Sequence, residues 1–331
     1  MSGEIPHPRE VFDLVGGEAV ETAFLSALER GRLHHAWLLV GPQGVGKATF
    51  AYLAARRLLG AAAEPALGPL GSRADDPISR QVMARSNPDL LVLERDGPDG
   101  KPRKVIPVDE ARAVSEFFSK SPANAPYRVA IIDAADDLNV NAANAVLKTL
   151  EEPPPRGVLF LVSHTPGGLL ATLRSRCRRL RFEPPPEAEA AAWVAARADV
   201  SLEDAIRLTR MAAGAPGRAW RLAGLGALDV DDAARTLIET LPRVDESAML
   251  VLADGFRGGE GASRFNLLFD RLADHVRRIA NGEALGSQSS RGDRWAQAWE
   301  LLSRLPEDVE NLNLDRADAF WTTLSRLCAI A

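Results

Sequence analysis

Residues 41–49 read Gly-Pro-Gln-Gly-Val-Gly-Lys-Ala-Thr. This stretch matches the phosphate-binding pattern G-x-x-x-x-G-K-[ST] except at its last position, where Ala48 replaces the hydroxyl residue that binds Mg²⁺. In that pattern the glycine-rich backbone cradles phosphates and the lysine contacts the β- and γ-phosphates. An apolar run precedes the loop (residues 36–40) and a helical pattern follows it (residues 48–59), which is the strand–loop–helix context that the motif requires. The stretch therefore predicts a phosphate-loop α/β domain.

Apolar runs elsewhere in the first half of the chain predict the rest of a parallel sheet. Continuous apolar runs at residues 90–93, 129–132 and 158–162 are typical of buried parallel strands, and a short run at 180–182 ends the region. The proline-rich stretch 183–186 then predicts a hinge, after which the strand signal disappears. We expect an α/β domain at residues 1–183, a small helical lid at 184–228 and an all-α domain at 229–331.

The helical half carries two apolar stripes, which predict helix packing. One consists of Phe265, Leu268, Phe269, Leu272, Val276 and Ile279, and the other of Trp295, Trp299 and Leu302. Between them, the small and polar residues of 282–292 predict a flexible loop.

Composition places the chain among ordinary soluble globular proteins. Hydrophobic residues make up 46% and charged residues 26% of 331 residues, enough for two or three domains. The chain has no apolar run long enough to span a bilayer and no signal-peptide pattern, and its two distant cysteines form no disulfide framework. These features predict a cytoplasmic protein with no membrane partner. The net charge of −5 argues against broad, charge-driven binding of nucleic acid by the chain alone.

An acidic residue follows the predicted strand at 129–132 and is the second candidate element of a nucleotide site, after the phosphate loop. Asp133 ends this strand, where phosphate-loop ATPases place an aspartate that helps to hold the metal, and Ala134 stands where many of them have a second acidic residue. Thr49 lies about 100° further round the helix than Ala48 and is a poor substitute for the missing hydroxyl. We expect a vestigial nucleotide site that binds ATP weakly or not at all. Its residues are Gly41, Gly44, Gly46, Lys47, Thr49 and Asp133.

Three further stretches carry a family resemblance. Residues 33–36 read LHHA, residues 144–154 read NAVLKTLEEPP, and residues 175–177 read SRC. In this order around the phosphate loop and the Asp133 strand, they resemble the clamp-loader branch of the AAA+ superfamily, and within it the delta-prime family of bacterial DNA polymerase III. The resemblance covers essentially the whole chain.

The resemblance implies a subunit of a pentameric clamp loader, which opens a ring-shaped sliding clamp and closes it on primed DNA. In this family the delta-prime subunit is typically a rigid stator that assembles with the tau/gamma motor subunits and the delta subunit. Arg176 would be an arginine finger that enters the ATP site of an adjacent tau/gamma subunit, and the C-terminal helices would form the collar of the ring. The expected function is clamp loading in DNA replication, with little or no hydrolysis by this chain.

The chain departs from the family at two places. Many members bind zinc through cysteines in the region that corresponds to residues 61–87, whereas this region contains no cysteine; Ala74, Pro77 and Arg80 stand in their place. We therefore expect no zinc and no other metal site. The lid arginine of active members corresponds to Gly217, unless a shift of one residue lets Arg218 replace it.

Two other functions stay open at this point. One is an autonomous AAA+ ATPase, such as a helicase loader or a branch-migration motor, which predicts ATP turnover by the single chain. Ala48, Ala134 and Gly217 count against it. The other is a pure scaffold subunit, in which Arg176 has only a structural role and the C-terminal helices carry the function.

Overall fold

The structure is a computed structural model that describes residues 5–95, 103–258, 261–284 and 289–330, with the backbone alone at both ends of the last gap. Contacts divide the chain into two compact units, Met1–Arg221 and Leu222–Ala331. Each unit is described by itself below. The finer division into an α/β domain, a lid and a third domain stays a prediction.

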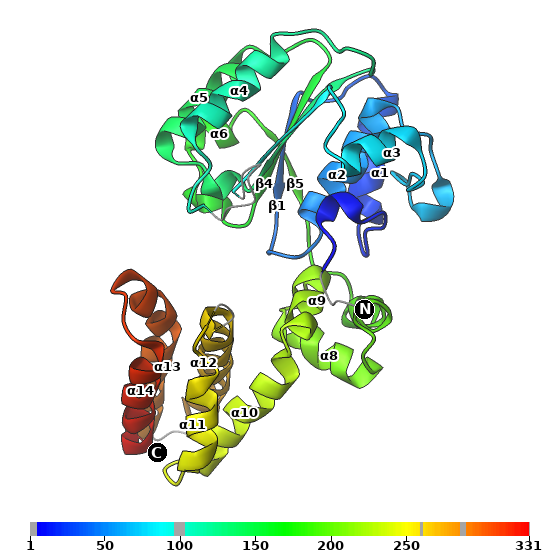
Figure 1. Cartoon of the computed structure of the whole chain (residues 1–331). Coiled ribbons are helices and arrows are strands. Elements are labelled where there is room, and N and C mark those ends of the chain that lie inside the picture. Colours follow the sequence, from blue (N-terminus) through cyan, green and yellow to red (C-terminus); the bar gives the residue numbers. More distant parts are fainter. Residues whose placement is uncertain (1–4, 96–102, 259–260, 285–288, 331) are drawn as a thin grey trace. The chain divides into compact units, whose positions relative to one another are not determined.

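The first unit is built on a five-stranded sheet with the order β2-β3-β4-β1-β5. Each neighbouring pair of strands is parallel, which confirms the predicted parallel α/β sheet (Figure 1). The strands are β1 (Ala36–Val40), β2 (Leu90–Glu94), β3 (Arg128–Asp133), β4 (Gly157–Ser163) and β5 (Arg178–Arg181). Because β1 and β3 flank β4, the residues that follow these three strands meet at one edge of the sheet.

Helices cover both faces of this sheet (Figure 1). Alternate side chains of β1 point to opposite faces of the sheet. On one face, Trp37 and Leu39 pack with α1 (Glu18–Glu29) and α2 (Lys47–Leu59). On the other face, Leu38 packs with α4 (Val108–Phe118) and α5 (Val140–Glu151). The short helix α3 (Pro77–Met83) joins the first face and α6 (Ala171–Arg174) the second. This arrangement fixes the start of α2 at the end of β1.

The first edge strand is less buried than its apolar sequence predicts. In β2 only Leu93 is buried, while Leu90, Leu91 and Val92 are half-buried, so the prediction of a buried strand is wrong for these three residues. The reason is that β2 lies at the edge of the sheet, where one side of the strand has no neighbour.

Three helices follow the proline-rich stretch 183–186, and they are called the lid helices below after the predicted lid. They are α7 (Glu187–Ala198), α8 (Leu202–Met211) and α9 (Pro216–Gly224). The indole N–H of Trp193 on α7 donates to the carboxylate of Asp13 at 2.9 Å, and the N–H of Gly16 donates to the carboxylate of Glu189 at 3.1 Å. The segment before α1 therefore ties the lid helices to the α/β part.

The second unit is entirely helical in its described residues. It contains α10 (Ala227–Thr240), α11 (Glu246–Asp254), α12 (Gly261–Ala284), α13 (Ser289–Asn311) and α14 (Arg316–Ile330). The first predicted stripe is confirmed from Phe265 to Val276, and Ile279 is half-buried at its end.

Two expectations for the second unit are wrong. Trp299 is 42% exposed, because Trp295, Ala298 and Leu302 form the buried line of α13 and Trp299 lies beside it. The loop expected at 282–292 is largely helical: α12 continues through Ala284 and α13 begins at Ser289, while residues 285–288 lie outside the described part. Glycine costs only about 1 kcal/mol within a helix, and packing of α12 against α13 offsets this cost.

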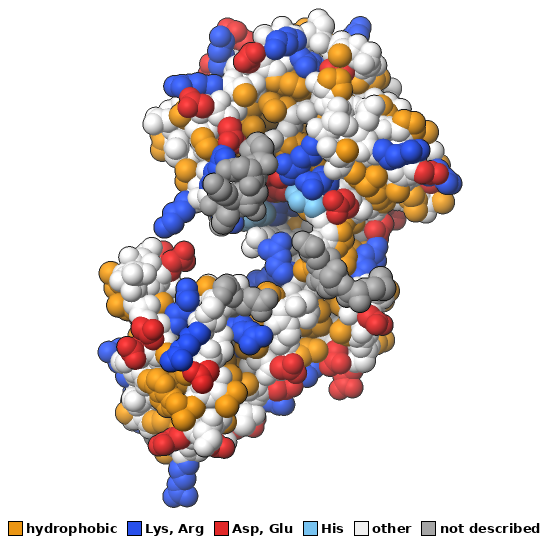
Figure 2. Space-filling model, viewed as in Figure 1, with side chains coloured by type: hydrophobic (Ala, Val, Ile, Leu, Met, Phe, Trp, Pro, Cys, Tyr) orange, Lys and Arg blue, Asp and Glu red, His pale blue; other side chains and the backbone are white. Residues whose placement is uncertain are grey.

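Charged side chains of both signs are interspersed with hydrophobic ones on the face of the molecule shown in Figure 2. This mixture agrees with the small net charge of −5. Among the described helices, none is both long enough and apolar enough to cross a membrane.

Candidate functional site

The predicted phosphate loop forms the turn from β1 into α2. Gly44 and Gly46 have φ values of 80° and 102°, a left-handed conformation that glycine adopts without steric cost. The loop and the start of α2 line a cavity of about 210 Å³. The structure thus brings Gly44, Gly46, Lys47, Thr49 and Asp133 together around one cavity.

Lys47 binds its own loop. Its Nζ donates to the carbonyl oxygens of Gly41 and Pro42, at 2.6 Å each. Burial lowers the pKa of Lys47 to about 8, although the negative charges of Asp133 and Asp136 act to raise it. These two contacts account for two of the three N–H donors of the ammonium group.

Asp133 ends β3 beside Glu94 of β2, and Glu94 is part of a polar cluster. Burial, reinforced by the negative charge of Glu94, raises the pKa of Asp133 to about 6. Glu94 itself accepts a hydrogen bond from the hydroxyl of Tyr52 at 2.9 Å, contacts Nε2 of His7 at 3.0 Å and pairs with Arg85. Burial alone would raise the pKa of Glu94. The hydrogen bond and charge of His7, together with Arg85 and Tyr52, have the larger effect and lower this pKa to about 2.

Asp136, just beyond Asp133, links the segment after β3 to the segment at the end of β4 by hydrogen bonds. Its carboxylate accepts hydrogen bonds from the hydroxyl of Ser163, from the N–H of His164 and from both the N–H and the hydroxyl of Thr165. These contacts give Asp136 a structural role, because they hold the two segments together.

The site lacks one of the usual ligands of Mg²⁺–ATP. The first residue after Lys47 is Ala48, which offers no oxygen to a metal ion, and Lys47 is engaged by the loop. In the part of the chain that the structure describes, no group of three or more His, Cys, Asp or Glu side chains could hold a metal ion. The cavity is also smaller than the roughly 300–1,000 Å³ of usual ligand pockets.

Two neighbouring segments press against the loop from outside. The N–H of Gly217, in the first turn of α9, donates to the carbonyl of Gly44 at 2.8 Å. A β-carbon at Gly44 would lie 2.4 Å from the backbone nitrogen of Arg218, and one at Gly46 would lie 2.2 Å from Cδ1 of Leu14. The two glycines are therefore required both by their φ angles and by the close approach of α9 and Leu14.

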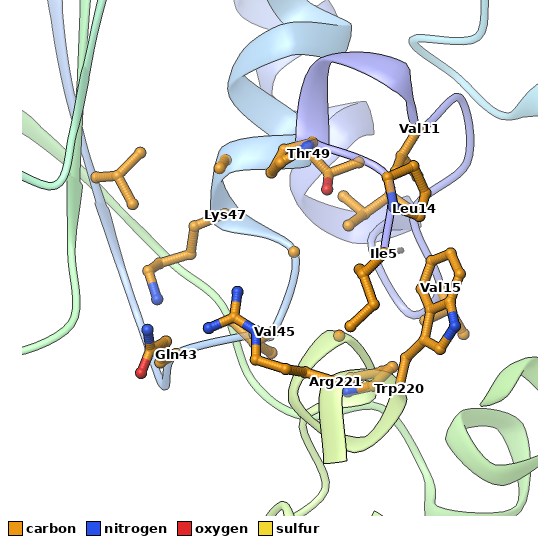
Figure 3. A pocket seen from close by; sticks show the side chains of 18 of the residues that line it. Ile5, Val11, Leu14, Val15, Gln43, Val45, Lys47, Thr49, Trp220 and Arg221 are labelled. Carbon is orange, nitrogen blue, oxygen red and sulfur yellow. The ribbon is translucent and has the colours of Figure 1, made fainter. Parts of the chain in front are cut away.

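The lid contributes a basic side chain that the sequence pattern did not single out. Arg221, four residues after Gly217 on α9, lines the cavity, and its guanidinium points toward Lys47 and Gln43 (Figure 3). Arg218 is not among the described residues that line the cavity. The spacing of four residues on an amphipathic helix is the signal that could have identified Arg221.

The opposite wall of the cavity is apolar. Leu14 and Val15 from the segment before α1 face Trp220 of the lid, whose ring meets that of Trp193 edge-on at 5.5 Å (Figure 3). The cavity therefore combines charged residues of both signs, Lys47, Arg221 and Asp133, with a hydrophobic side.

Arg176 lies in the turn between α6 and β5, and it is not among the described residues that line the cavity. One terminal nitrogen donates to the carbonyl of Thr172 at 2.9 Å and the other pairs with the carboxylate of Glu151 at 2.9 Å. The side chain is 37% exposed. Next to it, burial raises the pKa of the Cys177 thiol to about 12, so this thiol stays protonated.

Hydrogen bonds hold the segment where zinc ligands are absent. The Asp76 carboxylate caps α3 by accepting from the N–H groups of Ile78 and Ser79, and it also accepts from the N–H of Ala62. Of the three residues that replace the expected thiolates, Pro77 begins α3, Arg80 donates to the carbonyl of Asp75, and Ala74 has no side-chain donor.

Comparisons with known proteins agree with this description. A family model described as "DNA polymerase III, delta subunit" matches residues 16–186. The chain is 36% identical over 198 residues to DNA polymerase III subunit delta' of Pseudomonas aeruginosa, covering 60% of this chain and 58% of that protein. It is 34% identical over 200 residues to subunit delta' of Escherichia coli K12, covering 60% and 57%. The chain thus spans under two thirds of the length of these relatives.

Among solved structures, the chain is similar to a DNA polymerase III gamma subunit-related protein of Thermotoga maritima, with 16% identity, a TM-score of 0.48, and coverage of 92% of this chain and 99% of the other. This likeness is too distant to bear on function. The family model, in contrast, matches more than half of the 331 residues and includes both the phosphate loop and Arg176. The chain therefore belongs to the delta-prime family of DNA polymerase III, within the clamp-loader group of AAA+ proteins.

Proposed function

We propose that the chain is a stator subunit of the replicative clamp loader, the assembly that opens a ring-shaped sliding clamp and closes it on primed DNA. It works in the cytoplasm as part of a hetero-oligomer with tau/gamma and delta subunits. Its C-terminal helices hold it in the ring, and it meets the clamp and DNA through the complex. Arg176 enters the ATP site of a neighbouring tau/gamma subunit.

One contrast within the first unit supports this proposal. Arg176 is partly exposed and is absent from the described lining of the chain's own phosphate-loop cavity. In that cavity Lys47 is bound by the carbonyls of its own loop, and Ala48 offers no ligand to Mg²⁺. An arginine supplied in trans needs no nucleotide on its own subunit, so loss of the chain's own site is compatible with its role.

The chemistry required of Arg176 is electrostatic. In phosphoryl transfer, negative charge spreads over the oxygens of the transferred group, and a guanidinium placed against these oxygens stabilises it. Arginine suits this task because its planar group is permanently charged and presents several donors in a fixed geometry. The chain's own part is to hold that group at the subunit surface.

The proposal is tested by adding the chain to purified tau/gamma and delta subunits and measuring ATP turnover and clamp loading on primed DNA. We expect both activities to require the chain, which by itself turns over no ATP. We also expect the Lys47→Met variant to support loading at the rate of the unaltered chain. Turnover by the single chain, or loss of loading with folded Lys47→Met protein, would support an autonomous ATPase instead.

A further inference from the structure

Arg176 has a carboxylate partner on a different element of its own chain. Glu151 is the last residue of α5, and its Oε1 lies 2.9 Å from a terminal nitrogen of Arg176, which is 25 residues away in sequence. The carbonyl of Thr172 accepts from the other terminal nitrogen. The guanidinium is thus held from two sides, by α5 and by α6.

The place of Glu151 in its helix is electrostatically unfavourable. A negative charge at a helix C-terminus is opposed by the helix dipole, whose negative end lies there. The positive charge of Arg176 offsets this repulsion. Glutamate at this position is therefore better explained by its contact with Arg176 than by the stability of α5.

The two contacts leave most of the guanidinium available. A guanidinium has five N–H donors, and Glu151 and Thr172 engage one on each terminal nitrogen. The other three donors, including Nε–H, are engaged by neither of these two contacts. Arg176 can therefore stay in its observed orientation while it donates to phosphate oxygens.

From this geometry we infer that Glu151 is a positioning residue for Arg176, which orients the guanidinium at the subunit surface before it meets the neighbour's nucleotide. Without the carboxylate, the long side chain of Arg176 samples several rotamers, and ordering it on binding costs entropy. This inference rests on the proposed function, because it concerns the same arginine.

The test uses the complete loader assembled with the Glu151→Gln chain, which keeps the shape of the side chain and removes its charge. We expect kcat for ATP hydrolysis to fall about two- to fivefold, the range that an exposed ion pair supports, with KM for ATP unchanged. Glu152→Gln is the matched control, since Glu152 is an exposed carboxylate one residue further on. It should leave kcat unchanged.

A double-mutant cycle with Arg176→Ala separates positioning from a structural role. In the Arg176→Ala background, Glu151→Gln should lower kcat no further. A Glu151→Gln loader with normal kcat, or one with the same loss in the absence of Arg176, would overturn the inference while the role of Arg176 stands. If Arg176→Ala alone leaves kcat unchanged, the proposed function fails and this inference fails with it.

Discussion

The N–H of Gly217 donates a 2.8 Å hydrogen bond to the carbonyl oxygen of Gly44, so the first turn of lid helix α9 rests directly on the phosphate loop. We expect Gly217 to stand where active members of the family carry the lid arginine, unless Arg218 takes that place. Its lack of a side chain permits this contact, since a β-carbon at Gly217 would lie 2.9 Å from the carbonyl oxygen of Gly44. The hydrogen bond from Gly217 thus joins α9 to the phosphate loop within the first unit.

Substitution of Gly44 by alanine should disrupt the contact between α9 and the phosphate loop. The new β-carbon would clash with the backbone of Arg218, and the φ value of 80° is unfavourable for alanine. We expect the free energy of unfolding to fall by about 1–3 kcal/mol, measured by urea denaturation. Gly168→Ala is the control, because its β-carbon would meet no atom within 4 Å. Equal stability of both variants would show that α9 does not depend on the loop.

Asp133 should make stability depend on pH. Its pKa is raised from 3.8 to about 6 in the folded state, so its contribution to folding is complete below pH 3.8 and is lost as the pH rises through about 6. Above that pH the charge on this half-buried carboxylate opposes folding. We expect Asp133→Asn to be more stable than the unaltered chain by about 1–3 kcal/mol at neutral pH, with the difference closing as the pH falls from 6 toward 3.8.

Urea denaturation across this pH range checks the expectation for Asp133. Asp109→Asn serves as the control, because the Asp109 side chain is 84% exposed and pairs with Arg112 at the surface. A gain in stability that is the same at every pH would mean that the charge of Asp133 is not the cause.

The segment between α2 and β2 should owe its order to Asp76 and not to a metal. Asp76→Ala removes the cap of α3 and the bond to Ala62, and we expect it to cost about 1–2 kcal/mol of unfolding free energy. Asp75→Ala, which breaks only an exposed pair with Arg73, should cost less than about 0.5 kcal/mol. A chelator should leave Tm unchanged. A drop in Tm with chelator would reveal a structural metal.

Much of the fold could be predicted from local patterns. The phosphate-loop motif with its apolar strand and helix, and the apolar runs at 129–132 and 158–162, correspond to β1, α2, β3 and β4. The edge position of β2 could not be predicted, because an apolar run shows that a strand exists but not how many neighbours it has. The sequence predicts a loop at 282–292, whereas both ends of this stretch are helical. Packing between helices, which the local glycine content does not show, decides the structure there.

The sequence predicts which residues form the site, but not which contacts their side chains make. The motif identifies Lys47, but not that its ammonium turns back to Gly41 and Pro42. Likewise, nothing in the sequence near Arg176 points to Glu151, because their contact depends on how α5 and the turn before β5 meet in space. Contacts between residues far apart in the sequence arise from packing and leave no local signal.

The most direct test of the account is a single-turnover measurement of ATP hydrolysis by a loader that contains wild-type tau/gamma subunits and the Arg176→Ala chain. Arg179→Ala, an exposed arginine on β5, is the control. We expect hydrolysis at the site that Arg176 serves to slow by about 10³-fold, with assembly and ATP binding intact, as for other arginines supplied in trans. A rate equal to that of the control in an intact complex would contradict the assignment of Arg176.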